Sequence, residues 1–162
     1  MSERGGGKRV LLADIGGTNA RFAVLEGAEL GPVAHIPAAA HAHFAGALRA
    51  YLDTVAGSVD AAVLAVAGVV SGERCALTNN PWVIDAAELQ AAFGFSRVRL
   101  INDFEAIAWA LPHFPARDLF RIGGGDPAPD APLAVLGPGT GLGVAAWLPH
   151  GAGGPTVAGK EV

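Results

Sequence analysis

The 162-residue sequence is poor in the features that mark disulfide-rich, nucleic-acid-binding and membrane-spanning proteins. Its one cysteine, Cys75, excludes an intrachain disulfide framework and a zinc site built from several thiolates. Charged residues make up only 16% of the chain, and the net charge of −4 gives no basic surface for nucleic acid or anionic lipid. No apolar run approaches the ~18 residues of a membrane span, and no signal-peptide apolar region precedes the first expected strand. We therefore expect a cytoplasmic protein that binds neither nucleic acid nor membrane.

Apolar residues and glycine are abundant instead. Hydrophobic residues make up 51% of the chain, which excludes a disordered protein and is enough for a real core in a chain of ordinary domain length. Strands are expected at residues 10–15, 20–25, 32–36, 61–67, 97–101, 117–122, 133–136, 144–148 and 155–158, with an extended segment at 73–78. Helices are expected at residues 42–55, from a cap at Asp85 to Gly94, and at 103–111. Strands and helices that alternate after an initial hairpin predict an α/β fold.

The segment 123–132 (GGGDPAPDAP) is the best linker candidate, because it has three glycines and three prolines. This linker would separate a first lobe at 9–122 from the start of a second lobe at 133–162, and residues 1–8 are expected to form a flexible tail. A shift of 122 residues also aligns Gly17 and Thr18 with Gly139 and Thr140, in the same order of strand, glycine turn and strand. Duplication and chance recurrence of a hairpin both explain this match.

The stretch 11–24 (LLADIGGTNARFAV) contains a candidate phosphate loop. Backbone amides in a glycine turn can converge on an anion, because no Cβ blocks the approach. A carboxylate at the end of an apolar strand, Asp14, needs a partner if it is buried, and Mg²⁺ bound through water is one such partner. The alternative is a plain hairpin turn that Asp14 caps.

A second glycine loop, GPGTGLG at 137–143, also follows an expected strand and also contains Gly–Thr. Its spacing matches neither the dinucleotide fingerprint nor the Walker A motif. Two such loops together favour a nucleotide held between two lobes.

Two more stretches contain groups suited to sugar chemistry. Asn102 and Asp103 stand where an apolar strand ends and a helix begins, the place where open α/β sheets bind ligands. A carboxylate there can accept a proton from an attacking hydroxyl, although Asn and Asp are also common helix caps. The stretch 78–82 (TNNPW) offers amides and a hydroxyl beside an aromatic ring, and it reads equally well as an Asn–Pro turn with a packed tryptophan.

Together, the stretches 14–21 (DIGGTNAR), 78–82 (TNNPW), 101–112 (INDFEAIAWALP) and 137–144 (GPGTGLGV) resemble the bacterial glucokinase family of the hexokinase and actin-like ATPase superfamily. Their order and spacing match, and the resemblance runs from about residue 10 to 159. The pair INDF and GTGLG is quite specific to this family, whereas DIGGT is shared with a wider group of sugar kinases and repressors. That wider group usually has a cysteine-rich zinc motif, which this sequence lacks.

The resemblance implies an α/β fold: a ribonuclease H-like (actin-like ATPase) lobe with a mixed sheet, and the opening strands of a second, incomplete lobe. It implies ATP-dependent phosphorylation of the glucose 6-hydroxyl with Mg²⁺, with glucose and ATP as ligands, and leaves a homodimer open. Asp103 would be the general base and Asn102 a sugar ligand, with Thr78 and Asn79 bordering the sugar. Asp14 would hold Mg²⁺ through water. The phosphates would lie against two sets of residues: Gly16, Gly17, Thr18 and Asn19 on one side, and Gly139, Thr140 and Gly141 on the other.

The end of the sequence departs from the family pattern. Family members continue into a Gly–Glu–Gly–Gly–His segment, whose Glu and His also bind glucose, whereas TVAGKEV stops here with Glu161 after a lysine. We therefore expect a truncated glucokinase with impaired activity as an isolated chain. The alternatives are a non-catalytic sugar- or nucleotide-binding module and a fragment that needs a separate second lobe.

Overall fold

The computed structural model describes residues 7–77, 79–126, 128, 130–138, 142–149 and 156–161. It forms two compact units, Met1–Asp103 and Phe104–Val162. The expected limits at residues 8, 122 and 132 stay predictions, and most of the expected tail lies outside the described residues. Within the described ranges, no helix is both long and apolar enough to span a membrane.

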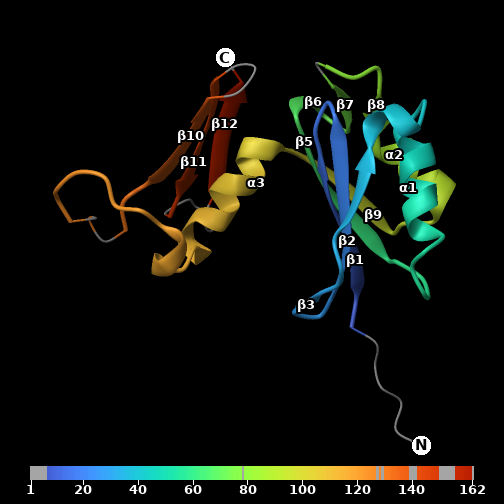
Figure 1. Cartoon of the computed structure of the whole chain (residues 1–162), viewed down its shortest axis with the longest axis horizontal. Helices are drawn as coiled ribbons and strands as arrows, with labels where there is room; N and C mark the ends of the chain where they lie inside the picture. Colours follow the sequence, from blue (N-terminus) through green and yellow to red (C-terminus); the bar gives the residue numbers. More distant parts are fainter. Residues whose placement is uncertain are drawn as a thin grey trace, which may run out of the picture. The chain divides into compact units, whose positions relative to one another are not determined.

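A six-stranded mixed sheet forms the centre of the first unit (Figure 1). Its strands are β1 (Arg9–Ile15), β2 (Asn19–Glu26), β3 (Glu29–Leu30), β4 (Ala34–Pro37), β5 (Ala61–Val66) and β9 (Arg97–Asn102). The order is β3-β2-β1-β5-β9, with β4 also paired to β2. β2 runs antiparallel to β1, whereas β1, β5 and β9 are mutually parallel. The α/β fold with a mixed sheet, predicted from the sequence, is therefore confirmed.

Two helices pack on one face of this sheet, α1 (Phe44–Leu52) and α2 (Ala86–Phe93). Both belong to a single hydrophobic core with alternate residues of the strands. The expected cap of α2 is confirmed: Asp85 Oδ1 accepts hydrogen bonds from the amides of Ala87 at 3.0 Å and Glu88 at 3.1 Å. Gly94 ends the helix with φ of +73°, a conformation that glycine adopts without strain.

A second, small sheet joins β6 (Gly68–Ser71), β7 (Arg74–Leu77) and β8 (Val83–Asp85) in that order. The sequence predicts only the middle strand, as the extended segment 73–78. β6 and β8 are four and three residues long, too short to show a period-2 pattern. β6 packs closely against β7 at Gly68. A Cβ added there would lie 3.0 Å from Cys75 Sγ and 2.9 Å from the Ala76 carbonyl oxygen, so a side chain does not fit without a shift.

The second unit contains α3 (Asp103–Ala110, of which Asp103 belongs to the first unit), η2 (Leu111–His113), η3 (Ala116–Asp118) and an antiparallel sheet of β10 (Leu133–Pro138), β11 (Leu142–Leu148) and β12 (Thr156–Glu161). The three sheet strands are all predicted from the sequence. The expected strand at 117–122 is wrong, because η3 occupies its start and no strand follows there. Phe120 and Ile122 are each 90% exposed, so the apolar pattern that suggested a strand has no neighbouring strand to pair with.

Tyr51 gives the core a built-in optical probe, because it is the only tyrosine in the chain. Its side chain is 7% exposed and stacks on Phe22, with ring centroids 5.3 Å apart. Burial raises the pKa of Tyr51 above its ordinary 10.0, although the charge of Arg9 and a hydrogen bond with the Val24 backbone oppose the rise. The neutral phenol therefore contributes stability that is complete below pH 10 and is lost as the pH rises through the native pKa.

We expect tyrosinate absorbance to titrate at a higher pH in the folded chain than in the same chain unfolded in guanidinium. Tyr51→Phe should abolish the tyrosinate absorbance. It should also remove the part of the decrease in stability above pH 10 that comes from ionisation of Tyr51. Identical midpoints in the folded and unfolded chains would show that the phenol is not desolvated.

Candidate functional site

The carboxyl ends of three parallel strands meet at one edge of the main sheet. Ile15, Val66 and Asn102 are aligned across β1, β5 and β9. The Ala67 amide donates to the Ile15 carbonyl at 2.9 Å, and Asn102 Nδ2 donates to the Gly68 carbonyl at 3.3 Å. The first glycine loop follows β1, and Asn102 ends β9 directly before Asp103, so two of the stretches chosen from the sequence start at this edge.

The first glycine loop is the bend of the β1–β2 hairpin. Ile15 pairs with Ala20, and the Gly16 amide donates to the Asn19 carbonyl at 2.9 Å. The Ala38 amide donates to the Thr18 carbonyl at 2.8 Å, which ties the bend to the segment after β4. No helix follows this loop, so it lacks the helix N-terminus of a P-loop.

Glycine at position 17 is explained by close packing. Neither Gly16 nor Gly17 has a positive φ, so conformational freedom is not the reason for either. A Cβ at Gly17 would lie 3.1 Å from Asn79 Cβ, a tight approach that the missing side chain avoids. The fold therefore brings the first glycine loop close to Asn79, and both are candidate site residues predicted from the sequence.

Asn80, next to Asn79, joins the bend to the turn before Trp82; the sequence offered it only as part of the TNNPW stretch and not as a contact of the first glycine loop. Its Nδ2 donates to the Gly17 carbonyl at 3.1 Å, and its Oδ1 accepts from the Trp82 amide at 2.8 Å. The signal was present, since an asparagine before Pro81 commonly bonds the backbone two residues on. Thr78 lies outside the described residues.

Trp82 is part of the core. It is 1% exposed, its indole Nε1 donates to the His41 carbonyl at 3.0 Å, and its ring meets Phe44 edge-on at 5.8 Å. Of the two alternatives for the TNNPW stretch, the turn with a packed tryptophan therefore describes Trp82. A hollow of about 350 Å³ lies above it, with Gly17, Asn79 and Asn80 in its lining.

Asp14 is paired with a cation instead of being buried. It faces Arg21 across the hairpin, and Arg21 Nη1 lies 2.6 Å from Asp14 Oδ2. Both side chains are about half exposed, so the ion pair contributes only about 0–1 kcal/mol to stability. Asp14 is therefore not buried, and of the partners considered from the sequence the structure shows an ion pair; its role toward Mg²⁺ stays a prediction.

The only arrangement for Mg²⁺ that the described candidate residues suit is one with a single protein carboxylate. Among the residues that the structure describes, no group of three or more His, Cys, Asp or Glu could hold a metal. Mg²⁺ keeps several waters and is commonly held by one or two carboxylates together with substrate phosphates. Asp14 fits that arrangement as a single outer ligand, in competition with Arg21.

The remaining candidate residues divide between the two units. Asp103 is the first residue of α3, and it and Asn102 are half-buried. Gly139, Thr140 and Gly141 lie outside the described residues, between the ends of β10 and β11. A separate cavity of about 450 Å³ contains Arg9, Glu26 and Tyr51 in its lining, and none of the candidate site residues lines it.

Comparisons with known proteins agree with the motifs. The family model described as Glucokinase matches residues 11–161. The glucokinase of Paramagnetospirillum magneticum is 45% identical over 148 residues, which cover 89% of this chain and 46% of that protein. A crystal structure of a glucokinase from an Antarctic psychrotroph has a TM-score of 0.79 at 34% identity, over 94% of this chain and 50% of its own. A glucokinase from Balamuthia mandrillaris in complex with glucose has a TM-score of 0.73 at 25% identity, over 99% and 49%. The chain thus spans about half the length of the relatives it matches.

Proposed function

Since this chain belongs to the glucokinase family, we propose that it supplies the base and the phosphate loops for transfer of a phosphoryl group from ATP to the 6-hydroxyl of glucose. One observation carries the proposal: the first glycine loop follows the end of β1, Asn102 is the end of β9, and these two strand ends are aligned at one edge of the sheet. A phosphate-binding loop and a proton acceptor must be close for a hydroxyl to attack a phosphoryl group, and this topology favours that closeness.

In the proposed reaction, the carboxylate of Asp103 accepts the proton of the sugar 6-hydroxyl as the hydroxyl oxygen attacks the γ-phosphorus. The bond between the γ-phosphorus and the bridging oxygen breaks at the same time, and ADP leaves with that oxygen. Asn102, already oriented by its bond to the Gly68 carbonyl, borders the sugar together with Asn79 and Thr78. Amides of the bend from Gly16 to Asn19 are proposed to contact the phosphates, and Gly139, Thr140 and Gly141 are proposed as the phosphate contacts of the second glycine loop. Phosphoryl transfer needs little covalent chemistry from the protein, so these residues act by positioning and by charge neutralisation.

Mg²⁺, when bound, would neutralise charge on the phosphates. Asp14 is the residue proposed to hold it, through water. Arg21, which donates a hydrogen bond to the Asp14 carboxylate, would compete with the ion for it. A homodimer and a cytoplasmic location also stay predictions.

The test is glucose-dependent ADP release. The assay compares the 162-residue chain with a joined protein, in which the chain is fused to the part of the Paramagnetospirillum magneticum glucokinase that it does not cover. We expect turnover in the joined protein and weaker turnover in the chain alone. Binding of glucose or ATP without ADP release in either protein would favour the second candidate, a non-catalytic binding module.

A further inference from the structure

The structure explains why glycine stands at two positions of the second glycine loop that are not among the proposed phosphate contacts. Gly137 and Gly143 face each other across β10 and β11. A Cβ added at Gly137 would lie 2.6 Å from Cε1 of Phe104, and one added at Gly143 would come closer still to the same ring. Neither glycine has a positive φ, so their backbone conformation would accept other residues. A side chain at either position would therefore have to displace the ring of Phe104.

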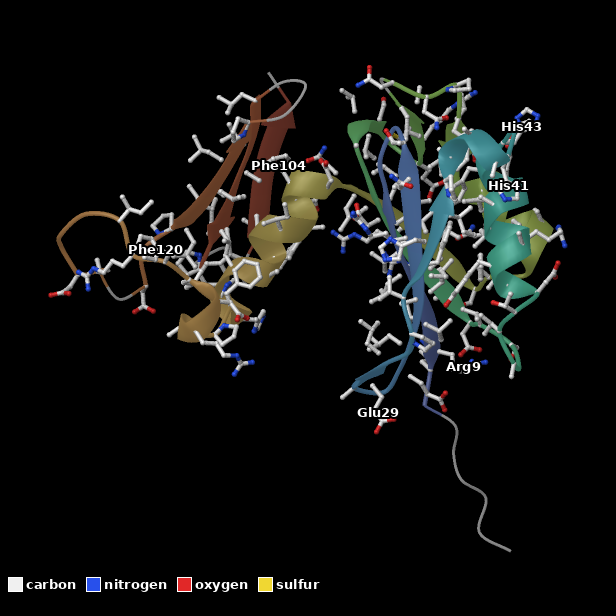
Figure 2. The ribbon with its side chains drawn as sticks, in the orientation of Figure 1. Arg9, Glu29, His41, His43, Phe104 and Phe120 are labelled. Carbon is white, nitrogen blue, oxygen red and sulfur yellow. The ribbon has the colours of Figure 1, made fainter. Side chains whose placement is uncertain are left out.

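Phe104 occupies a particular place in the chain. It is the second residue of α3, directly after Asp103, and it belongs to the same compact unit as β10 and β11 (Figure 2). Glycine inside a strand often marks a close approach, and an aromatic ring laid over such a glycine covers backbone that would otherwise be exposed. The ring thus joins the start of α3 to both strands that lead into the second glycine loop.

We propose that Phe104 is a positioning residue for nucleotide binding: by lying on the Gly137–Gly143 pair, its ring fixes both ends of the loop that contains Gly139, Thr140 and Gly141. The inference rests on the proposed function, because the position of this loop matters to a ligand only if the loop meets nucleotide phosphates. The spacing of GPGTGLG then has two explanations: the inner residues contact the phosphates and the outer glycines receive the ring.

The test compares Phe104→Ala with Phe120→Ala, the same substitution at a side chain of the same unit that is 90% exposed. The readouts are the affinity of the full chain for ADP with Mg²⁺, measured well below the melting temperature, and hydrogen exchange of the paired Leu136 and Val144. Phe104→Ala should weaken ADP binding on the order of tenfold and speed exchange at both amides. Phe120→Ala should match the wild type in both.

A pair of substitutions that enlarges residue 143 and shrinks residue 104 distinguishes an effect of the ring on the loop from a general loss of stability. Gly143→Ala alone should weaken ADP binding because its Cβ displaces the ring, and Phe104→Leu added to Gly143→Ala should restore part of the affinity. If the wild type binds ADP and Phe104→Ala binds it as well as Phe120→Ala does, the inference is wrong and the proposed function stands. If the wild type binds no ADP, the proposed function fails for this chain and the inference fails with it.

Discussion

Asp103→Asn in the joined protein is expected to lower kcat by a factor of about 10²–10⁴, with little change in the KM for glucose. Asparagine has nearly the size of aspartate and can still bond a sugar hydroxyl, but it cannot accept the proton that the attacking oxygen releases. The loss should therefore fall on the chemical step. ADP release at saturating glucose and ATP measures it.

The control is Asp118→Asn, which neutralises an exposed carboxylate of the second unit that lies 3.7 Å from Arg117 Nε. It should leave kcat and KM unchanged. Equal kcat values for the Asp103 variant, the Asp118 variant and the unsubstituted protein would exclude Asp103 as the base.

Trp82→Ala is expected to cost about 3–5 kcal/mol of the free energy of unfolding, against a total of about 5–15 kcal/mol for a typical domain. The substitution empties the volume of a side chain that is 1% exposed. It also leaves the His41 carbonyl without the indole donor. Urea unfolding followed by far-UV circular dichroism measures the loss.

Two further substitutions are expected to lower the free energy of unfolding by less than Trp82→Ala does. Trp82→Phe keeps most of the apolar volume but removes the N–H donor, so its cost should be intermediate. Phe93→Ala removes a half-buried ring at the end of α2 and should cost less than Trp82→Ala. A Trp82→Ala variant as stable as the wild type would contradict the conclusion that this ring stabilises the core.

The long elements were predictable because each has an unbroken apolar pattern. The runs that become β1, β5 and β9 were placed within one residue at each end, and their parallel pairing follows from the helices between them. The short strands β6 and β8 were missed, although β7, which is also four residues long, was expected as an extended segment. The run 117–122 looked like a strand because composition alone says nothing about whether a partner strand is present.

The positions of the candidate site residues in the fold were predictable where these residues stand at the ends of predicted strands. Asn102 and Asp103 were placed correctly between a strand and a helix. The partner of Asp14 could also have been found, because a short hairpin bend places Arg21 opposite it. Contacts between distant segments were out of reach: nothing local to Asn80 indicates the Gly17 carbonyl 63 residues away, and nothing local to Gly143 indicates Phe104.

The internal match at a shift of 122 residues has a structural counterpart. β1, β2 and β4 form an antiparallel set in which the middle strand pairs on both sides, and β10, β11 and β12 do the same. In each set, the sequence between the first two strands contains glycine. This common topology favours duplication over chance recurrence of a hairpin.

The most direct test of the central claim is to identify where the phosphoryl group of ATP goes. The joined protein is incubated with glucose, ATP and Mg²⁺, and the products are separated and identified by ³¹P NMR. The account predicts glucose 6-phosphate and ADP in equal amounts, both formed about 10²–10⁴ times more slowly when Asp103 is replaced by asparagine. ADP accompanied by inorganic phosphate, or no phosphorylated sugar at all, would contradict it.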